Sequence, residues 1–226
     1  DVVENNLCVM GGHSLAIANM VDTFEGGYAK RLHNIVTHNL AWNGHERSFT
    51  AEELGKVRDY LKKTLQDLEQ VEEFPEPTFV LANLHRGNVL LNDAGEISGI
   101  SQFNFAQAGV PAAEMYNAFW QFADAAVAPT AKVHAALVEA YQKSGGQFDP
   151  AEEATQKVMN VLNVNHFLRA ATVYSSMRDR QDQSKPDLMR NRWGKRFKEE
   201  ILFPLIEQGK VDYDLFSQII NEKWKP

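Results

Sequence analysis

The sequence has almost no cysteine and no long hydrophobic run. Cys8 is the single cysteine among 226 residues, which excludes a disulfide within the chain and suits a reducing compartment. No run of about 18 apolar residues is present, so we expect no transmembrane helix. The first residues also lack the pattern of a signal peptide. We therefore expect a cytoplasmic protein that does not associate with membranes.

Positive charge is scarce as well. The formal net charge is −7, and the one basic stretch lies between Arg190 and Arg196, where we expect a solvated helix face. Nucleic-acid binding therefore has little electrostatic support. The hydrophobic content of 44% is sufficient for one sizeable core, and no repeat or low-complexity tract divides the chain.

The apolar periodicity predicts a mostly helical α+β domain around a small β-region. Thr50 and Glu53 form a capping-box signature, and apolar residues follow on one stripe from Leu54 to Leu68. We predict helices over residues 14–24, 28–36, 50–71, 112–125, 130–144, 150–177, 193–207 and 212–223, with loops at 38–49 and 179–187. We predict a strand over 78–82 and a hairpin of 89–91 with 97–100, closed by the turn at 92–95. The chain is then one unit with a helical segment (1–77), a hairpin region (78–110) and a helical subdomain (111–226).

The most informative motifs lie between Phe79 and Glu114. The first reads Leu81-Ala82-Asn83-Leu84-His85-Arg86-Gly87-Asn88. After the predicted hairpin, the second reads Ile100-Ser101-Gln102-Phe103-Asn104. The third, Gly109-Val110-Pro111-Ala112-Ala113-Glu114, opens a predicted helix.

These three motifs resemble the catalytic core of the aminoglycoside phosphotransferase and choline kinase-like family. That family has His-Gly-Asp-Leu-His-x-x-Asn, a hairpin, Ile-Asp-Phe-Asp and then Gly-Asp-Pro-x-x-Asp. Upstream, the segments 10–15 and 31–33 are loosely similar to family positions. The resemblance implies the C-terminal lobe of a protein kinase-like fold.

At the chemical positions of the family, this chain carries amides in place of acids. By the resemblance, Asn83 stands at the catalytic Asp, and Asn88 keeps the position of the Asn that assists the metal. Gln102 stands at the metal-binding Asp, and Asn104 replaces a second acid. An amide is no general base near neutral pH, which forfeits roughly 10²–10⁴-fold in rate. Mg²⁺ prefers carboxylates and phosphate oxygens. The motifs therefore predict weak or lost metal binding and lost or altered catalysis.

The resemblance assigns further roles. His85 corresponds to a structural histidine, buried and hydrogen-bonded behind the catalytic loop. Tyr116, Trp120 and Asp124 fall where related enzymes contact their substrate. The other histidines show no metal-ligand spacing, and we read them as surface or capping residues.

The resemblance also implies a missing half of the nucleotide site. No Gly-x-Gly-x-x-Gly occurs in the sequence, and no strand run with a following lysine precedes residue 79. Since the chain starts at Asp1 rather than Met, we expect a fragment or processed product that lacks the N-terminal lobe. Its expected partner is that lobe or a second chain. No cofactor is expected for this part alone, and Mg²⁺ and ATP are expected if it is active.

Three functions remain open from the sequence. The first is a pseudokinase-like domain that has lost phosphoryl transfer and serves binding or assembly. The second is an ATP-dependent phosphotransferase for a small hydroxylated or cationic metabolite, with Asp93 or Glu96 replacing the lost acids. The third is different chemistry on the same scaffold, such as nucleotidyl transfer.

Overall fold

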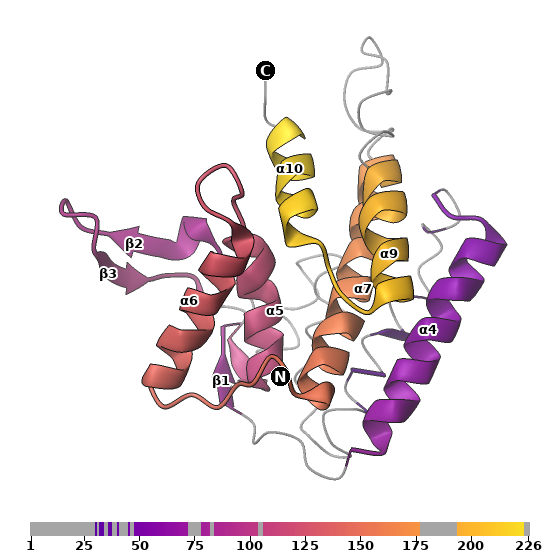
Figure 1. The fold of residues 1–226 in the computed structure, drawn as a ribbon, viewed down its shortest axis with the longest axis horizontal. Coiled ribbons are helices and arrows are strands. Elements are labelled where there is room, and N and C mark those ends of the chain that lie inside the picture. Colours follow the sequence, from indigo (N-terminus) through magenta and orange to yellow (C-terminus); the bar gives the residue numbers. More distant parts are fainter. Residues whose placement is uncertain are drawn as a thin grey trace, which may run out of the picture.

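The computed structural model shows a helical body with two small antiparallel sheets at one side (Figure 1). The structure describes residues 48–71, 78–81, 84–103, 106–176 and 194–223, and in addition 30, 32–33, 36–37, 40 and 45. The predicted class, α+β and mostly helical, is confirmed. In these parts of the chain, no helix has the length and apolar content needed to cross a membrane.

Helix α4 (Ala51–Glu69) begins at the predicted capping box. The Thr50 hydroxyl accepts from the Glu53 N–H at 3.2 Å, and the Glu53 carboxylate accepts from the Thr50 N–H at 2.7 Å. These two bonds satisfy amides that have no partner within the helix. The predicted stripe faces the core, since Val57, Leu61 and the leucines that follow on this face are buried.

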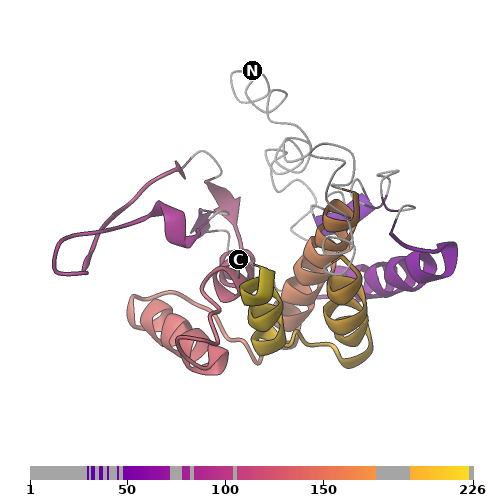
Figure 2. The same ribbon diagram turned by 90° about the horizontal axis from the view of Figure 1, so that it is seen from above.

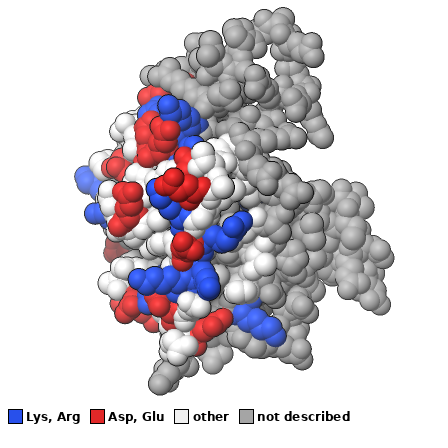
Figure 3. Space-filling model, turned by 90° about the vertical axis from the view of Figure 1, so that its right-hand side faces the viewer, with Lys and Arg blue, Asp and Glu red and all other residues white. Residues whose placement is uncertain are grey.

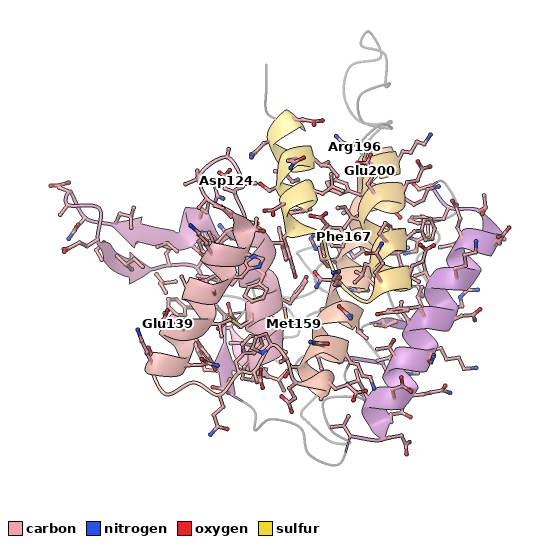
Figure 4. All side chains as sticks on the ribbon, in the orientation of Figure 1. Asp124, Glu139, Met159, Phe167, Arg196 and Glu200 are labelled. Atoms are coloured by element: carbon pink, nitrogen blue, oxygen red, sulfur yellow. The ribbon has the colours of Figure 1, made fainter. Side chains whose placement is uncertain are left out.

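Helix α7 (Glu153–Ser176) is the centre of the body and packs against α4, α5 (Pro111–Gln121) and a π-helical segment, η5 (Phe197–Leu202). Figure 4 shows Phe167 of α7 in the middle of the helices, and its side chain is fully buried. Helix α7 has buried residues on several faces, as expected of a helix surrounded by protein. The body is completed by α6 (Thr130–Lys143), α9 (Phe203–Gln208) and α10 (Tyr213–Lys223).

The strands form two nested antiparallel pairs. Strand β1 (Thr78–Val80) pairs with β4 (Gln107–Gly109), and between them β2 (Val89–Leu91) pairs with β3 (Ile97–Ile100). The inner pair is the predicted hairpin, and it projects away from the helices in Figures 1 and 2. Because the outer pair closes around the hairpin, it brings the described residues that flank the hairpin, 84–88 and 101–103, to the same end.

Glycine is required where β4 crosses β1. A Cβ at Gly109 would lie 2.6 Å from Val80 Cγ2, and Val80 is itself buried. The close approach explains the glycine that opens the third motif, since a larger residue would require the buried Val80 side chain or the strand to move.

The predicted helices after residue 50 are confirmed, with shifts of at most four residues at their ends. Two details differ. Leu40 is helical, although we expected a loop from 38 to 49. The predicted helix 193–207 contains the π-helical segment η5, which ends just before Pro204. The proline ring would clash with the Glu200 carbonyl in a regular α-helix, and a wider turn relieves this clash. The helix predicted over 14–24 and the loop over 179–187 lie outside the described residues.

Opposite charges alternate on the face formed by α4 and η5 (Figure 3). Arg196 holds the Glu200 carboxylate through two bonds of 2.7 and 2.9 Å and also contacts Glu222 at 2.6 Å. Lys198 pairs with Glu53 at 2.9 Å, which ties η5 to the start of α4. The described end of the basic stretch is therefore neutralised by neighbouring acids.

Candidate functional site

The loop between β1 and β2 closes on itself through His85 and Asn88. The His85 N–H donates to Asn88 Oδ1 at 2.9 Å, and His85 Nδ1 accepts from the Gly87 N–H at 3.0 Å. The two residues thus cap the short 3₁₀ turn η2 (Arg86–Asn88) reciprocally. A Cβ on Gly87 would lie 3.1 Å from the His85 ring, so glycine allows the loop to fold this tightly.

Asn88 connects the first motif to the second. Its side chain is 1% exposed, and its carbonyl accepts from the Ser101 N–H at 2.8 Å. The next residue, Gln102, has φ = 65°, and it is the single non-glycine residue with positive φ among the described residues. A glutamine held in the left-handed region is strained, and such strain gathers at functional sites. The Asn88–Ser101 bond therefore joins the end of the first motif to the start of the second.

Helix α5 holds the loop from behind. The buried Asn117 amide donates to the Leu84 carbonyl at 3.0 Å. At the C-terminal end of the helix, Arg86 forms an ion pair with Asp124 at 3.1 Å (Asp124 is labelled in Figure 4). Asp124 also accepts from the Asn221 amide at 3.1 Å. These bonds fix the loop against α5 and α10.

A cleft of about 320 Å³ lies where this loop meets α5 and α10. Its apolar walls come from Trp120, Phe216 and Ile220, and its polar rim from His85, Arg86 and Asn221. An apolar wall with a few polar groups is the usual composition of a small-molecule site.

The residues at the metal positions do not fit Mg²⁺. Asn88 Oδ1 is buried and already accepts the His85 N–H, and the exposed Gln102 offers only a neutral amide. Mg²⁺ requires near-octahedral oxygen ligands and favours carboxylates. In the described part of the chain, no group of three His, Cys, Asp or Glu side chains is arranged to hold a metal ion.

The structure places the other predicted site residues as follows. Asn83 and Asn104 lie outside the described residues. His85 is hydrogen-bonded within the loop, but it is half-buried rather than buried as we expected. The Asp124 carboxylate accepts hydrogen bonds from Asn221 and Arg86, and these bonds lower its pKa. Its oxygens are therefore occupied by contacts within the fold. Trp120 lines the cleft.

A second cluster lies between α5 and α7. It contains Tyr116 and Trp120, which we predicted from the sequence as substrate contacts, and His166, which we did not. The Trp120 and His166 rings are 4.4 Å apart, and the Tyr116 and His166 rings are 6.3 Å apart. Burial raises the pKa of Tyr116 to about 12. Burial, followed by the charge of Arg169, lowers the pKa of His166 to about 4. His166 is therefore neutral at physiological pH, and Arg169 carries the positive charge of the cluster.

His45 has a structural role. It is 1% exposed, and its Nδ1 lies 2.7 Å from the Thr172 hydroxyl of α7. The contact joins the segment before α4 to the central helix.

The sequence matches no protein-family model, no curated protein and no solved structure. The resemblance in the three motifs is therefore the starting point for a functional proposal.

Proposed function

We propose that this chain is the C-terminal lobe of a kinase-like domain that has lost phosphoryl transfer and acts as a pseudokinase-like binding or scaffold module. The buried Asn88 cap carries this proposal. In a phosphotransferase, an oxygen at this position would face a metal, whereas Asn88 Oδ1 accepts the His85 amide inside the loop. The neutral amides at 83, 102 and 104 support the same conclusion.

The topology supports the kinase-like framework. The pairing of β1 with β4 around the β2–β3 hairpin brings the two loop motifs together, and the Ser101–Asn88 bond joins them. Phosphoryl transfer depends on positioning and charge. The framework for positioning is retained here, and the charges are replaced.

The partner in this proposal is an N-terminal lobe or a second chain. Several apolar side chains around the two sheets face solvent, including Phe79 at 66% and Ile97 at 70% exposure. The Phe79 and Phe103 rings lie 6.4 Å apart on this surface. Apolar side chains gathered in this way mark interaction surfaces more often than free surface. A cytoplasmic location is part of the same proposal and rests on the single cysteine.

An activity assay tests the proposal. The wild-type chain is incubated with Mg·ATP and a panel of choline-like amines, aminoglycosides and sugars, and ADP release is followed. We expect no acceptor-dependent ADP release. Turnover with any acceptor would overturn the proposal.

The strain at Gln102 favours the second candidate, an active phosphotransferase with a non-standard site. In that case Asp93 or Glu96 of the hairpin turn would supply the acid, and Asp93→Asn or Glu96→Gln would abolish ADP release. Loss of ADP release in one of the two variants, with an active wild type, would establish this candidate.

A further inference from the structure

Arg169 differs from Arg58, which is exposed, and from Arg86 and Arg196, which are paired with acids. The guanidinium groups of Arg86 and Arg196 each contact a carboxylate within 3.1 Å. Arg169 is half-buried in α7, and no acid of the described residues lies within ion-pair distance of it. Burial of the group also lowers its pKa. A charge partly removed from water without a counter-ion costs free energy, so a ligand that pairs with it gains affinity.

The cluster that contains Arg169 also holds an unpaired hydrogen-bond donor. The Trp120 indole N–H is buried and has no hydrogen-bond acceptor among the described residues. It faces the Tyr116 hydroxyl closely enough to lower the pKa of that phenol, although the geometry falls short of a hydrogen bond. The charge of Arg169 also acts on Tyr116, as the smallest of the causes that shift the pKa of its phenol. Among the described residues, Arg169 thus has no carboxylate partner and the Trp120 N–H has no acceptor.

The helix geometry explains why these groups meet. His166 and Arg169 are three residues apart on α7, and Tyr116 and Trp120 are four apart on α5, so each pair shares one helix face. The two faces meet because α5 packs directly on α7. All four side chains are half-buried, so the cluster retains contact with solvent.

We infer that Arg169 and Tyr116 form a binding site for an oxyanion, a carboxylate or phosphate group of a small molecule, between α5 and α7. Arg169 supplies the charge and paired N–H donors, and Tyr116 supplies an O–H donor. The inference is independent of the kinase-like proposal. It also reverses the expected preference, because a site built of donors and a cation disfavours the cationic metabolites that the resemblance implies.

Titration calorimetry at constant ionic strength tests the site with four probes: benzoate, inorganic phosphate, neutral benzyl alcohol and cationic benzylamine. We expect saturable binding of benzoate or phosphate and none of the other two. If benzoate binds and phosphate does not, the ligand is a carboxylate. If phosphate binds and benzoate does not, the ligand is a phosphate. If neither oxyanion saturates, or if benzylamine binds equally well, the inference is wrong.

Variants locate the binding. Arg169→Gln should weaken the oxyanion roughly 10- to 100-fold, the effect of one charge-assisted interaction. Arg58→Gln removes the same charge from the exposed face of α4 and should leave binding unchanged. In the absence of ligand, Arg169→Gln should have a Tm equal to or above that of the wild type, since it removes an unpaired charge. A lower Tm with unchanged affinity would show a purely structural arginine and overturn the inference.

Tyr116→Phe keeps the test decisive if Arg169→Gln does not fold. This change removes only the hydroxyl and keeps the ring contact with His166. We expect several-fold weaker oxyanion binding at an unchanged fold, whereas unchanged affinity would contradict the proposed role of the donor.

Discussion

The reciprocal cap between His85 and Asn88 predicts a measurable loss of stability when the Asn88 amide is removed. In Asn88→Ala, the His85 N–H loses the Asn88 Oδ1 acceptor that lies 2.9 Å away. Asn88 is only 1% exposed in the wild type, so water has little access to replace this bond. An unsatisfied polar group of this kind costs about 1–3 kcal/mol, and loss of a cap falls in the same range. We expect the free energy of unfolding to fall by about 2 kcal/mol, which corresponds to roughly 4–8 °C in Tm for a chain of this size.

Asn92→Ala is the matched control. The Asn92 side chain also accepts from backbone amides, those of Ala94 and Glu96, but it lies in the exposed hairpin turn. Water replaces the lost bonds there, so the loss should stay below about 1 kcal/mol. Urea unfolding of both variants gives the comparison. Equal losses in the two variants, or less than about 0.5 kcal/mol for Asn88→Ala, would refute the argument from burial.

Three further predictions concern pH, association and the lost acids. The pKa of His166, about 4 in the folded chain and roughly 6.5 when unfolded, means that the unfolded state binds more protons between these values. The free energy of unfolding should therefore fall as the pH falls below about 6.5, and this group should account for a loss of about 2 kcal/mol at pH 5. In urea unfolding at neutral pH and at pH 5, His166→Gln should lose about 2 kcal/mol less than the wild type. An equal loss in the two proteins would contradict this prediction. Ile97→Lys should reduce self-association, measured by sedimentation, or the binding of a hydrophobic dye, measured by fluorescence. A wild-type chain that is monomeric and binds no dye would count against an interaction surface. The double variant Asn83→Asp with Gln102→Asp should release no phosphate above background, because Asn104 stays an amide and Asn88 Oδ1 still accepts the His85 N–H. Phosphate release would show that the site is complete.

Local signals in the sequence were sufficient for most helices and for the hairpin. The Thr50–Glu53 capping box and the stripe after it predicted α4, and the Asn92–Gly95 turn predicted the pairing of β2 with β3. In each case the determining interactions lie within about 20 residues of one another. The irregular turn before Pro204 was missed, although the proline was visible in the sequence.

Long-range contacts were harder to predict. The pairing of β1 with β4 joins segments about 30 residues apart and depends on the close approach at Gly109. The ion pair between Asp124 and Arg86 depends on how α5 packs against the loop. From the sequence alone, we therefore predicted Asp124 as a substrate contact. Tyr116 and Trp120 were named from the sequence, but His166 and Arg169 were missed because they come from a second helix that packs on the first. A charged residue within the apolar run of α7 was the one available signal.

The amides in the motifs were evident from the sequence, but the fate of Asn88 was not. Its spacing from Asn83 fits a metal-assisting residue as well as a structural one. The hydrogen bond to His85 favours the structural role, and it arises from the tight turn that Gly87 permits.

Calorimetric titration of the wild-type chain with ATP, with Mg²⁺ present and again with excess EDTA, tests the central claim most directly. The claim is that the two motifs retain a kinase-like arrangement without a functional metal site. The account predicts no saturable, Mg²⁺-dependent heat at millimolar nucleotide. Saturable binding that requires Mg²⁺ and is lost when EDTA is added would contradict it.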